Sequence, residues 1–272
     1  MVVSIVTYAP DIALLRRVVS KLAKAVREAY GDAIGRVELV IVDNGPCDNY
    51  RMELEALLQE CWPIGGREGA RVLHPGRNLG YGEGHNLAAC EVSATYRLIL
   101  NPDVLLNEDA LVRAVSFMER NPGVGMLSPW AIDRRGERQY LCKQYPGAWN
   151  LVLRGLMPHG VQRLFRRRLD RYQMRGVTES QVVESVPIVS GCFMLIRESV
   201  WQRVDGFDPR FFLYFEDFDL SLRIGVLSRI AYVPSVRIRH FGGYAARKGW
   251  RHVYLFVRSA LTFYRIHGWR WW

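Results

Sequence analysis

The chain has 272 residues, 49% of them hydrophobic, which suits one large domain or two small ones around a packed core. Lysines and arginines outnumber aspartates and glutamates by 37 to 27, and the net charge of +10 favours an anionic partner: a nucleic acid, a phosphorylated metabolite or a membrane surface. The five cysteines are scattered and form no C-x-x-C pair, which argues against a disulfide framework and a zinc site, and no stretch reaches the roughly 18–20 apolar residues of a membrane span. We therefore expect a soluble or peripheral protein of a reducing cytosol.

The first half of the chain alternates short apolar strands with amphipathic helices. Strands are predicted at residues 2–8, 36–44, 71–74 and 96–103, and helices at 11–30, 49–61, 84–92 and 107–120. This alternation predicts an α/β fold with a parallel sheet covered by helices on both faces. Ligands of such sheets bind beyond the carboxyl ends of the strands, so we look for the chemistry at those ends.

Two of the predicted strands end in acidic motifs. VIVDNG places Asp43 after one strand, and LILNPD places Asn101 and Asp103 after another. Each motif alone is most simply a turn, because Asp, Asn, Gly and Pro are the commonest turn formers. Their presence at the ends of two strands of one predicted sheet favours a shared cleft.

Between these motifs lies a glycine-rich segment, RNLGYGEGHN, at residues 77–86. It does not match G-x-G-x-x-G, which argues against a dinucleotide-binding fold. Arg77, Asn78 and Asn86 lie in a turn that leads into a helix. Such a turn can bring backbone N–H groups close to a phosphate or a ribose, and a plain flexible loop is the alternative.

The second half of the chain differs in kind from the first. A hairpin is predicted at 124–141 with IDRRGE as its turn. Two further segments, a helix within 163–176 and the C-terminal stretch 251–272, mix arginines with aliphatic and aromatic side chains. Each has the composition of an interfacial amphipathic helix at a membrane, and each is equally compatible with packing on the core. Base stacking on RNA is the competing interpretation of these basic, aromatic stretches.

The stretch FFLYFEDFDLSLR places three carboxylates directly after an aromatic run. Asp219 has a partner four residues later in Arg223, which is a plain structural explanation. Asp217 has no such local partner. At the start of a helix, the helix dipole would hold the Asp217 carboxylate ionised and the neighbouring rings would limit access of water, as a general base requires. Its neighbour Glu216 belongs to the same predicted helix start.

The stretch 229–243 is predicted to form two short strands, with His240 at the end of the second. A single histidine there is most simply a structural hydrogen-bonding residue. If the fold brings it to Asp103, the two form an oxygen and nitrogen site of the kind that Mn²⁺ or Mg²⁺ uses with nucleotide phosphates.

Five segments together resemble the inverting family 2 glycosyltransferases of the GT-A fold, and among these the rhamnosyltransferase-like branch of bacterial surface polysaccharide synthesis. The segments are VIVDNG, NLGYGEGHN, LNPDV, SGCFMLIRESVWQRVDGFDPRFFLYFEDFDLSLR and HFGG. The resemblance implies a single GT-A domain at 1–245, with a Rossmann-like nucleotide-sugar half at 1–128 and an acceptor and catalytic half with a smaller sheet at 129–245. A basic, aromatic helical segment would follow at 246–272.

The resemblance also implies roles for individual residues. The expected donor-binding residues are Thr7, Ala9, Asp43, Arg77, Asn78, Gly80, Asn101, Asp103, Gly191 and Cys192. LNPDV stands where the family has its metal-binding D-x-D motif, so Asp103, with His240 as an added ligand, would hold a divalent cation, Mn²⁺ or Mg²⁺. Asp217 would be the catalytic base, and Glu216 would orient the site.

Two departures from the family pattern matter. Asn101 replaces the first Asp of a strict D-x-D, which leaves metal dependence open. Pro46 stands where many relatives have serine, so hydroxyl contacts to the nucleotide are not carried over.

The implied reaction transfers a sugar with inversion from a nucleotide-sugar donor onto a lipid-linked saccharide, in the cytoplasm at the inner face of an anionic cytoplasmic membrane. KQYPGAW at 143–149 favours dTDP-L-rhamnose as the donor, with a UDP-hexose or GDP-mannose as alternatives. A non-catalytic module that binds a nucleotide sugar or RNA is the other class of function. The intact Glu216 and Asp217 pair argues against an inert module, and we expect no nucleic-acid partner.

Overall fold

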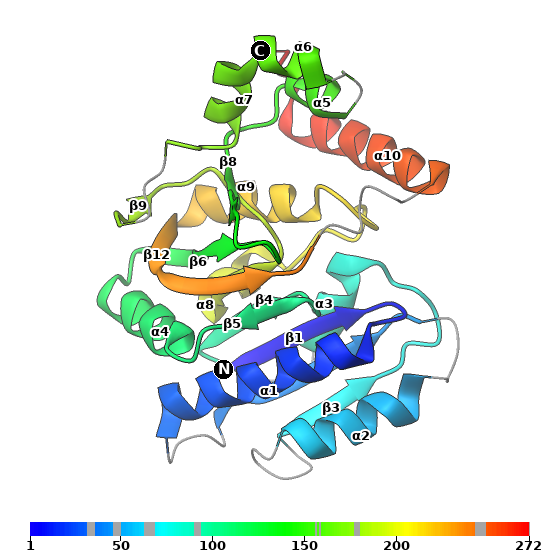
Figure 1. Cartoon of the computed structure of the whole chain (residues 1–272), viewed down its shortest axis with the longest axis vertical. Coiled ribbons are helices and arrows are strands. Elements are labelled where there is room, and N and C mark those ends of the chain that lie inside the picture. Colours follow the sequence, from blue (N-terminus) through cyan, green and yellow to red (C-terminus); the bar gives the residue numbers. More distant parts are fainter. Residues whose placement is uncertain are drawn as a thin grey trace.

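The structure is a computed structural model that describes residues 1–31, 36–45, 50–62, 69–89, 94–155, 157, 159–176, 180–242 and 249–271. One mixed sheet carries helices on both faces, and a two-stranded sheet lies beside it (Figure 1). The strands are β1 (Val2–Thr7), β2 (Glu38–Asp43), β3 (Ala70–Leu73), β4 (Tyr96–Leu100), β5 (Val104–Leu106), β6 (Val124–Ile132), β7 (Arg138–Gln139), β8 (Cys142–Lys143), β9 (Val183–Glu184), β10 (Ile188–Val189), β11 (Phe193–Arg197) and β12 (Arg229–His240). The helices are α1 (Ile12–Tyr30), α2 (Arg51–Cys61), α3 (Tyr81–Ala89), α4 (Ala110–Arg120), α5 (Ala148–Gly155), α6 (His159–Leu164), α7 (Arg166–Tyr172), α8 (Glu198–Val204), α9 (Glu216–Leu227) and α10 (Trp250–His267).

The strands of the first half form a parallel sheet, as predicted. β1 pairs in parallel with β2 and β4, and β2 pairs in parallel with β3. Successive side chains of a strand point to opposite faces, so Val3 and Ile5 pack in the core with α1, whereas Val2 and Val6 pack with α3. Burial on both faces fixes the register of the strand, because a slip by one residue would exchange the two sets.

Beyond β4 the sheet is mixed, which differs from the parallel sheet that the strand and helix alternation predicted. β11 runs antiparallel between β4 and β6, and β12 runs parallel to β6. Because β11 runs against β4, its first residues lie beside the end of β4. The backbone N–H of Asn101 donates to the carbonyl of Cys192 at 2.9 Å. The LNPD motif and the Gly191–Cys192 pair, 90 residues apart in sequence, are thereby brought to one edge of the sheet.

The predicted hairpin is confirmed, whereas the prediction of two short strands within 229–243 is wrong. β7 pairs antiparallel with β6, and the Asp133 carboxylate accepts hydrogen bonds from two backbone N–H groups of the turn. The stretch 229–240 is one strand, β12, rather than two. It shifts register against β6 between Val233 and Arg237, around Pro234, because proline has no N–H to donate to the ladder.

The basic segment 163–176 is two short helices rather than one. α6 and α7 meet at Phe165, whose backbone is not helical. Leu169 and Tyr172 of α7 are buried, whereas Leu164 of α6 is exposed. The apolar side chains that suggested one amphipathic face therefore belong to two helices that point them in different directions.

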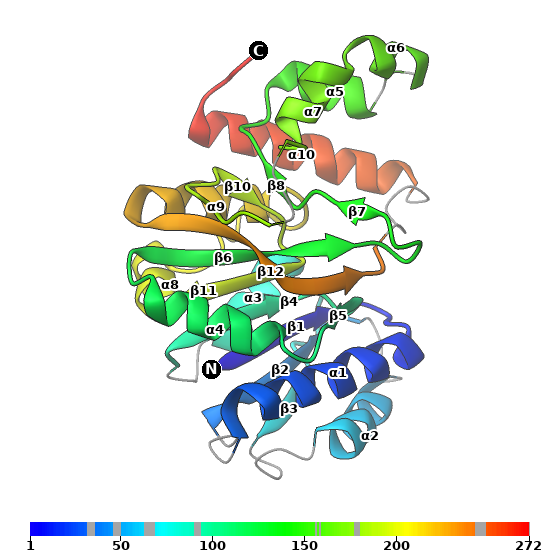
Figure 2. The same cartoon turned by 60° about the vertical axis from the view of Figure 1, so that its left-hand side comes forward.

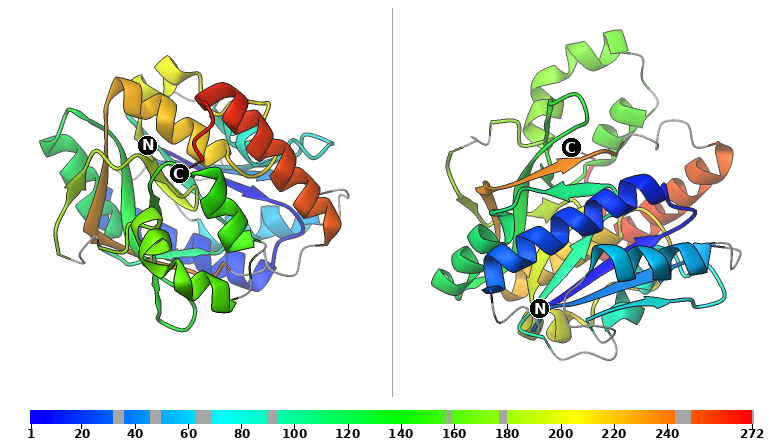
Figure 3. Two further views of the ribbon diagram at one scale, coloured as in Figure 1. Left: turned by 90° about the horizontal axis from the view of Figure 1, so that it is seen from above. Right: turned by 60° about the horizontal axis from the view of Figure 1, so that its bottom comes forward.

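The C-terminal helix α10 packs on the aromatic run that precedes α9. Phe263 and Tyr264 are buried in a cluster with Phe211 and Phe215. Ser259 adds a hydrogen bond from its hydroxyl to the Leu213 carbonyl at 2.8 Å. Figure 2 shows α10 and α5–α7 at the end of the molecule opposite α1 and α2, and the view from above in Figure 3 shows α10, in red, beside the green α5–α7. Among the described helices none is both long and apolar enough to span a bilayer.

Gly80 occupies a position that tolerates no side chain. Its φ is +84°, and a Cβ there would lie 2.2 Å from the backbone oxygen of Phe212. Gly136, in the hairpin turn, has the same φ of +84° but nothing within 4 Å of its Cβ position. An alanine would thus meet the same unfavourable φ at both positions, but it would clash with a neighbouring atom only at Gly80.

We expect Gly136→Ala to lower the free energy of unfolding by about 1–2 kcal/mol, which is the cost of a left-handed residue. Gly80→Ala should lower it by roughly a further 1–3 kcal/mol, because a backbone carbonyl must move. Urea unfolding of both variants measures the difference. Equal losses at the two positions would show that the close contact at Gly80 carries no energy.

Candidate active site

The acid pair predicted as catalytic opens helix α9, as expected. Glu216 and Asp217 are the first two helical residues, and Phe215 precedes them at φ +65°. Tyr214 is also left-handed, at φ +71°. Left-handed conformations cost non-glycine residues on the order of 1–3 kcal/mol each and persist only where packing enforces them. Burial of Phe215 against Phe263 of α10 supplies that packing.

Asp217 is held in one orientation by backbone donors. Its Oδ2 accepts from the N–H of Gly191 at 3.0 Å, and its Oδ1 accepts from the N–H of Phe218 at 3.0 Å. Burial raises the pKa of Asp217 above its ordinary value of 3.8, while the positive charge of Lys143 and these N–H groups oppose that rise. The carboxylate is thus fixed in place with a proton affinity above that of a solvated aspartate.

Glu216 is buried more deeply, at 7% exposure. Burial first, and the negative charge of Asp217 second, raise the pKa of Glu216 well above 4.5. Its Oε2 accepts no hydrogen bond from the residues that the structure describes. The two adjacent acids thus differ in their surroundings, and the pKa of Glu216 is raised further above its ordinary value than that of Asp217.

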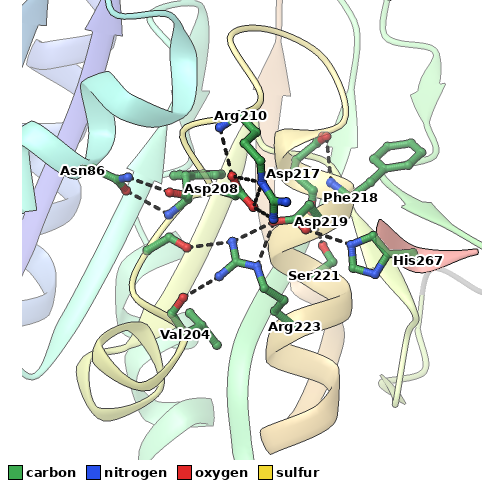
Figure 4. A network of polar contacts seen from close by, with 12 residues as sticks. Asn86, Val204, Asp208, Arg210, Asp217, Phe218, Asp219, Ser221, Arg223 and His267 are labelled. Carbon is green, nitrogen blue, oxygen red and sulfur yellow. Dashed lines mark hydrogen bonds and ion pairs between the residues drawn. The ribbon is translucent and has the colours of Figure 1, made fainter. Parts of the chain in front are cut away.

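The third acid, Asp219, is structural. It is 0% exposed, and its carboxylate pairs with Arg223 at 2.8 Å, the predicted pair, and with Nε2 of His267 at 2.8 Å (Figure 4). His267 belongs to α10, and sequence spacing gave no sign of this contact. Arg223 also donates to the carbonyls of Val204 and Gly206. Removing one partner of such a buried pair costs about 3–5 kcal/mol, so the network fixes α9 and α10 together.

Tyr81 joins the separate motifs of the site, and sequence analysis missed it. Its hydroxyl donates to the carbonyl of Gly191 at 2.6 Å and lies 3.0 Å from Oδ1 of Asn101. Burial raises the pKa of Tyr81 well above 10, and the nearby charges of Glu216 and Asp217 add to that rise. Asp103 raises the pKa of Tyr81 in the same way, so carboxylates from separate motifs act on one hydroxyl. Its place inside NLGYGEGHN was the available signal.

Asp103 and His240 converge. Nε2 of His240 lies 3.4 Å from Oδ1 of Asp103, and the N–H of Phe241 donates to the Asp103 carbonyl at 2.9 Å. Gln139 sets the imidazole tautomer. Its amide nitrogen donates to the His240 carbonyl at 3.1 Å, so its oxygen faces Nδ1 at 2.8 Å, and Nδ1 of the neutral ring carries the proton.

These two residues fit a divalent cation. The tautomer leaves a lone pair on Nε2 of His240 facing Oδ1 of Asp103, a buried atom without a hydrogen bond from the described residues. Two electron-pair donors that face each other favour a cation between them. Within the described ranges no group of three His, Cys, Asp or Glu side chains could hold an ion, so the remaining ligands would come from the diphosphate of a bound nucleotide.

The carboxyl ends of β1 and β2 form a second group of expected donor residues. Oδ1 of Asp43 accepts from the N–H of Gly45 at 3.0 Å and from the Thr7 hydroxyl at 3.4 Å. Oδ2 of Asp43 lies 3.6 Å from Nδ1 of His74, another residue that sequence analysis missed. Ala9 follows β1, exposed and left-handed at φ +48°. Pro46 and Cys47 lie outside the described residues.

In the glycine-rich segment the backbone of Gly80 is hydrogen-bonded within the protein. Asn44 holds it to the end of β2 by donating to the Gly80 carbonyl at 2.7 Å, and the N–H of Gly80 donates to Asn78 at 2.8 Å. Both backbone groups of Gly80 are therefore used inside the protein. Gly82 packs on Phe207, where an added Cβ would lie 2.8 Å away. The glycines allow α3 to approach the rest of the site.

Two hollows adjoin the site. One, of about 590 Å³, is an open groove along β3 and α3, and Arg77, exposed and paired with Glu83 at 3.2 Å, lies on its wall. The other, of about 370 Å³, lies over the acid pair, and its lining residues are Leu151, Tyr172, Tyr214, Phe215, Glu216, Asp217, Phe218 and Phe256. The buried Cys192 thiol, whose pKa burial raises to about 12, does not ionise and is unreactive. The hollow over the acid pair, which we call the aromatic pocket, includes Asp217 in its wall.

The raised pKa of Glu216 predicts a pH-dependent loss of stability. Because the folded protein holds the Glu216 proton more tightly than the unfolded chain does, the free energy of unfolding falls as pH rises from about 4.5 through the raised pKa. Glu216→Gln cannot ionise, so its stability should decline less over that window and exceed that of the wild type at neutral pH. Urea unfolding at a series of pH values measures this, with exposed Glu137→Gln as the control. Identical pH profiles for wild type and Glu216→Gln would contradict the assignment.

Known proteins resemble this chain in sequence along most of its length. The family described as glycosyltransferase like family 2 matches residues 3–271. N-acetylglucosaminyl-diphospho-decaprenol L-rhamnosyltransferase of Mycobacterium tuberculosis is 28% identical over 250 residues, which cover 86% of this chain and 74% of that protein. Rhamnosyltransferase WbbL of Escherichia coli K12 is 26% identical over 171 residues, which cover 60% of this chain and 61% of WbbL.

Solved structures share the fold. The mannosyltransferase PcManGT from Pyrobaculum calidifontis, in complex with GDP-Man and Mn²⁺, matches 98% of this chain with a TM-score of 0.60 at 16% identity and is itself 75% covered. TarS of Staphylococcus aureus matches 90% of this chain with a TM-score of 0.55 at 15% identity, and this chain spans only 37% of it. The resemblance drawn from the five sequence segments is confirmed: the chain belongs to the glycosyltransferase like family 2 and is a glycosyltransferase with the GT-A fold.

Proposed function

We propose that the enzyme transfers L-rhamnose from dTDP-L-rhamnose, with inversion, onto a lipid-linked saccharide in the synthesis of a bacterial surface polysaccharide. The observation that carries the proposal is the Asp217 carboxylate. It is held by two backbone N–H groups, lies beside Glu216, whose pKa burial raises, and opens to the aromatic pocket. The KQYPGAW stretch and the two rhamnosyltransferase relatives support the choice of donor.

The successive parts of the chain would have separate roles. Residues 1–128 would bind the nucleotide sugar, with Thr7 and Asp43 at the nucleoside and Asn78 and Gly80 shaping the turn beside it. Residues 129–245 would supply the base and the acceptor pocket. The C-terminal segment 246–272 would complete that pocket through Phe256 and associate with the inner face of the cytoplasmic membrane.

The reaction is a single displacement. An acceptor hydroxyl in the aromatic pocket gives its proton to Asp217 while its oxygen bonds to the anomeric carbon of the donor. The bond from that carbon to the diphosphate oxygen breaks, and its electron pair leaves with the nucleoside diphosphate. Each oxygen of Asp217 accepts one backbone hydrogen bond and retains a lone pair, so the carboxylate can receive the proton without losing its position.

Asp103 and His240 would hold the divalent cation. When bound, the cation neutralises negative charge on the leaving diphosphate. Gln139 keeps the His240 imidazole in the tautomer that can ligate. Asn101, a neutral side chain where a strict D-x-D has a carboxylate, instead contacts Tyr81 and ties the motif to Gly191.

Asp217→Asn should reduce kcat by about 10²–10⁴-fold, which is the usual contribution of a general base. The asparagine keeps the shape of the carboxylate, so donor affinity should be unchanged, and Asp205→Asn, an exposed acid outside the site, should retain full activity. In the wild type, kcat/KM should fall as pH drops through the raised pKa of Asp217, because protonation removes the base. Near-normal turnover by Asp217→Asn would remove this residue as the base.

A donor panel tests the sugar and the cation together. We expect dTDP-L-rhamnose with Mn²⁺ or Mg²⁺ to raise the melting temperature more than UDP-GlcNAc, UDP-galactose or GDP-mannose does, since a ligand of the folded state stabilises it by RT ln(1 + [L]/Kd). EDTA and Asp103→Asn should each abolish the shift. A larger rise in melting temperature with another nucleotide sugar would identify that sugar, and not dTDP-L-rhamnose, as the donor. Binding without slow donor hydrolysis would favour the non-catalytic module, and salt-sensitive binding of RNA alone would favour the RNA-binding one.

A further inference from the structure

Helix α10 has two apolar faces, whereas a helix packed on a soluble protein needs one. Its inner face is buried in the aromatic cluster around Phe215 and Phe263. Its outer face consists of Trp250, Val253, Tyr254, Val257 and Leu261, all of which are exposed. These positions follow the three- and four-residue spacing of one helical stripe, so the five side chains form a continuous surface. We call this surface the outer face of α10.

The charges beside the outer face have one sign. Arg251, Arg258 and Arg265 are exposed on α10, and the described residues 249–271 contain no aspartate or glutamate. Beyond the helix, Trp269 stacks on Tyr264 with ring centroids 4.6 Å apart. An apolar stripe flanked by arginines and tryptophans is complementary to the boundary between acyl chains and anionic headgroups.

The same helix forms a wall of the aromatic pocket. Phe256 lines the pocket, and its ring centroid lies 5.2 Å from that of Phe215, directly before the acid pair. On the next turn toward the start of the helix, His252 lies 3.0 Å from the hydroxyl of Tyr214, another lining residue. Val253 and Val257 of the outer face are therefore helical neighbours of the residues that border the pocket. A surface that binds the outer face would lie next to the pocket.

We propose that the outer face of α10 docks on an anionic membrane surface and holds the mouth of the aromatic pocket at the bilayer. A lipid-linked acceptor then presents its sugar to Asp217 while its lipid stays in the membrane. This inference rests on the proposed function for the identity of the acceptor. An anionic lipid surface suits the outer face better than RNA does, because three of its five side chains, Val253, Val257 and Leu261, are aliphatic and offer no plane on which bases can stack.

The test compares two substitutions that add the same charge at exposed valines. Val253→Glu changes a residue of the outer face that is 60% exposed, and Val226→Glu changes one on α9 that is 84% exposed. Neither side chain is buried, so both variants should melt as the wild type does. Flotation is measured with vesicles of equal parts phosphatidylglycerol and phosphatidylcholine, and with pure phosphatidylcholine, at low and high salt.

We expect the wild type and Val226→Glu to float with the anionic vesicles at low salt and to be released as salt rises. Val253→Glu should bind at least about tenfold more weakly, because a carboxylate on the outer face must be desolvated and is repelled by the headgroups. Equal flotation of Val253→Glu and the wild type would overturn the docking surface. So would binding of a short RNA without vesicle binding, or a dimer that Val253→Glu dissociates.

Turnover separates docking from catalysis. With an acceptor embedded in the anionic vesicles, Val253→Glu should lose activity by the same factor as it loses binding. With the same saccharide diphosphate on a short, water-soluble alkyl chain, it should match the wild type within about twofold. An equal loss on both acceptors would overturn the presentation of the acceptor by α10. If the wild type turns over neither acceptor, the proposed function fails, while flotation still decides the docking surface.

Discussion

Three carboxylates at the start of one helix must be removed from water, and much of the site depends on how each is accommodated. Asp219 forms an ion pair with Arg223 and a hydrogen bond with His267. Asp217 is held by two backbone N–H groups. Glu216 avoids the cost of a buried charge by retaining its proton, since burial raises its pKa. Three solutions within four residues give these carboxylates three different environments, and Asp217 is the acid that we propose as the base.

These solutions draw distant segments together. The N–H that holds Asp217 comes from Gly191, which lies beside the end of β4 only because β11 runs antiparallel to that strand. The hydroxyl of Tyr81 donates to the carbonyl of Gly191 and also contacts Asn101, in the motif that follows β4. The close approach of α3 that places Tyr81 there is possible because Gly80 and Gly82 carry no side chain. The position of Asp217 is thus set by two strands, a helix start and a pair of glycines.

The aromatic run before α9 also helps to remove these carboxylates from water. Its rings shield the acids from solvent, and two of its residues, Tyr214 and Phe215, are held in left-handed conformations by packing on α10. That packing gives α10 a share in the pocket over Asp217 through Phe256. Helix α10 therefore borders the pocket over Asp217 on one side. On its other side it presents the apolar, arginine-flanked outer face that we propose as the membrane-docking surface.

Local sequence patterns determined the α/β class, the parallel strands of the first half, the hairpin, the Asp219–Arg223 pair and the helix start at Glu216, because each depends on residues near one another in the chain. They also placed Asp103 and His240 at strand ends. Only the tertiary structure decided the antiparallel insertion of β11, the continuous β12, the break at Phe165, and the contacts of Tyr81, Gln139 and His267. These depend on which strands become neighbours and on how closely helices approach, and such contacts between segments up to 110 residues apart leave no local period in the sequence.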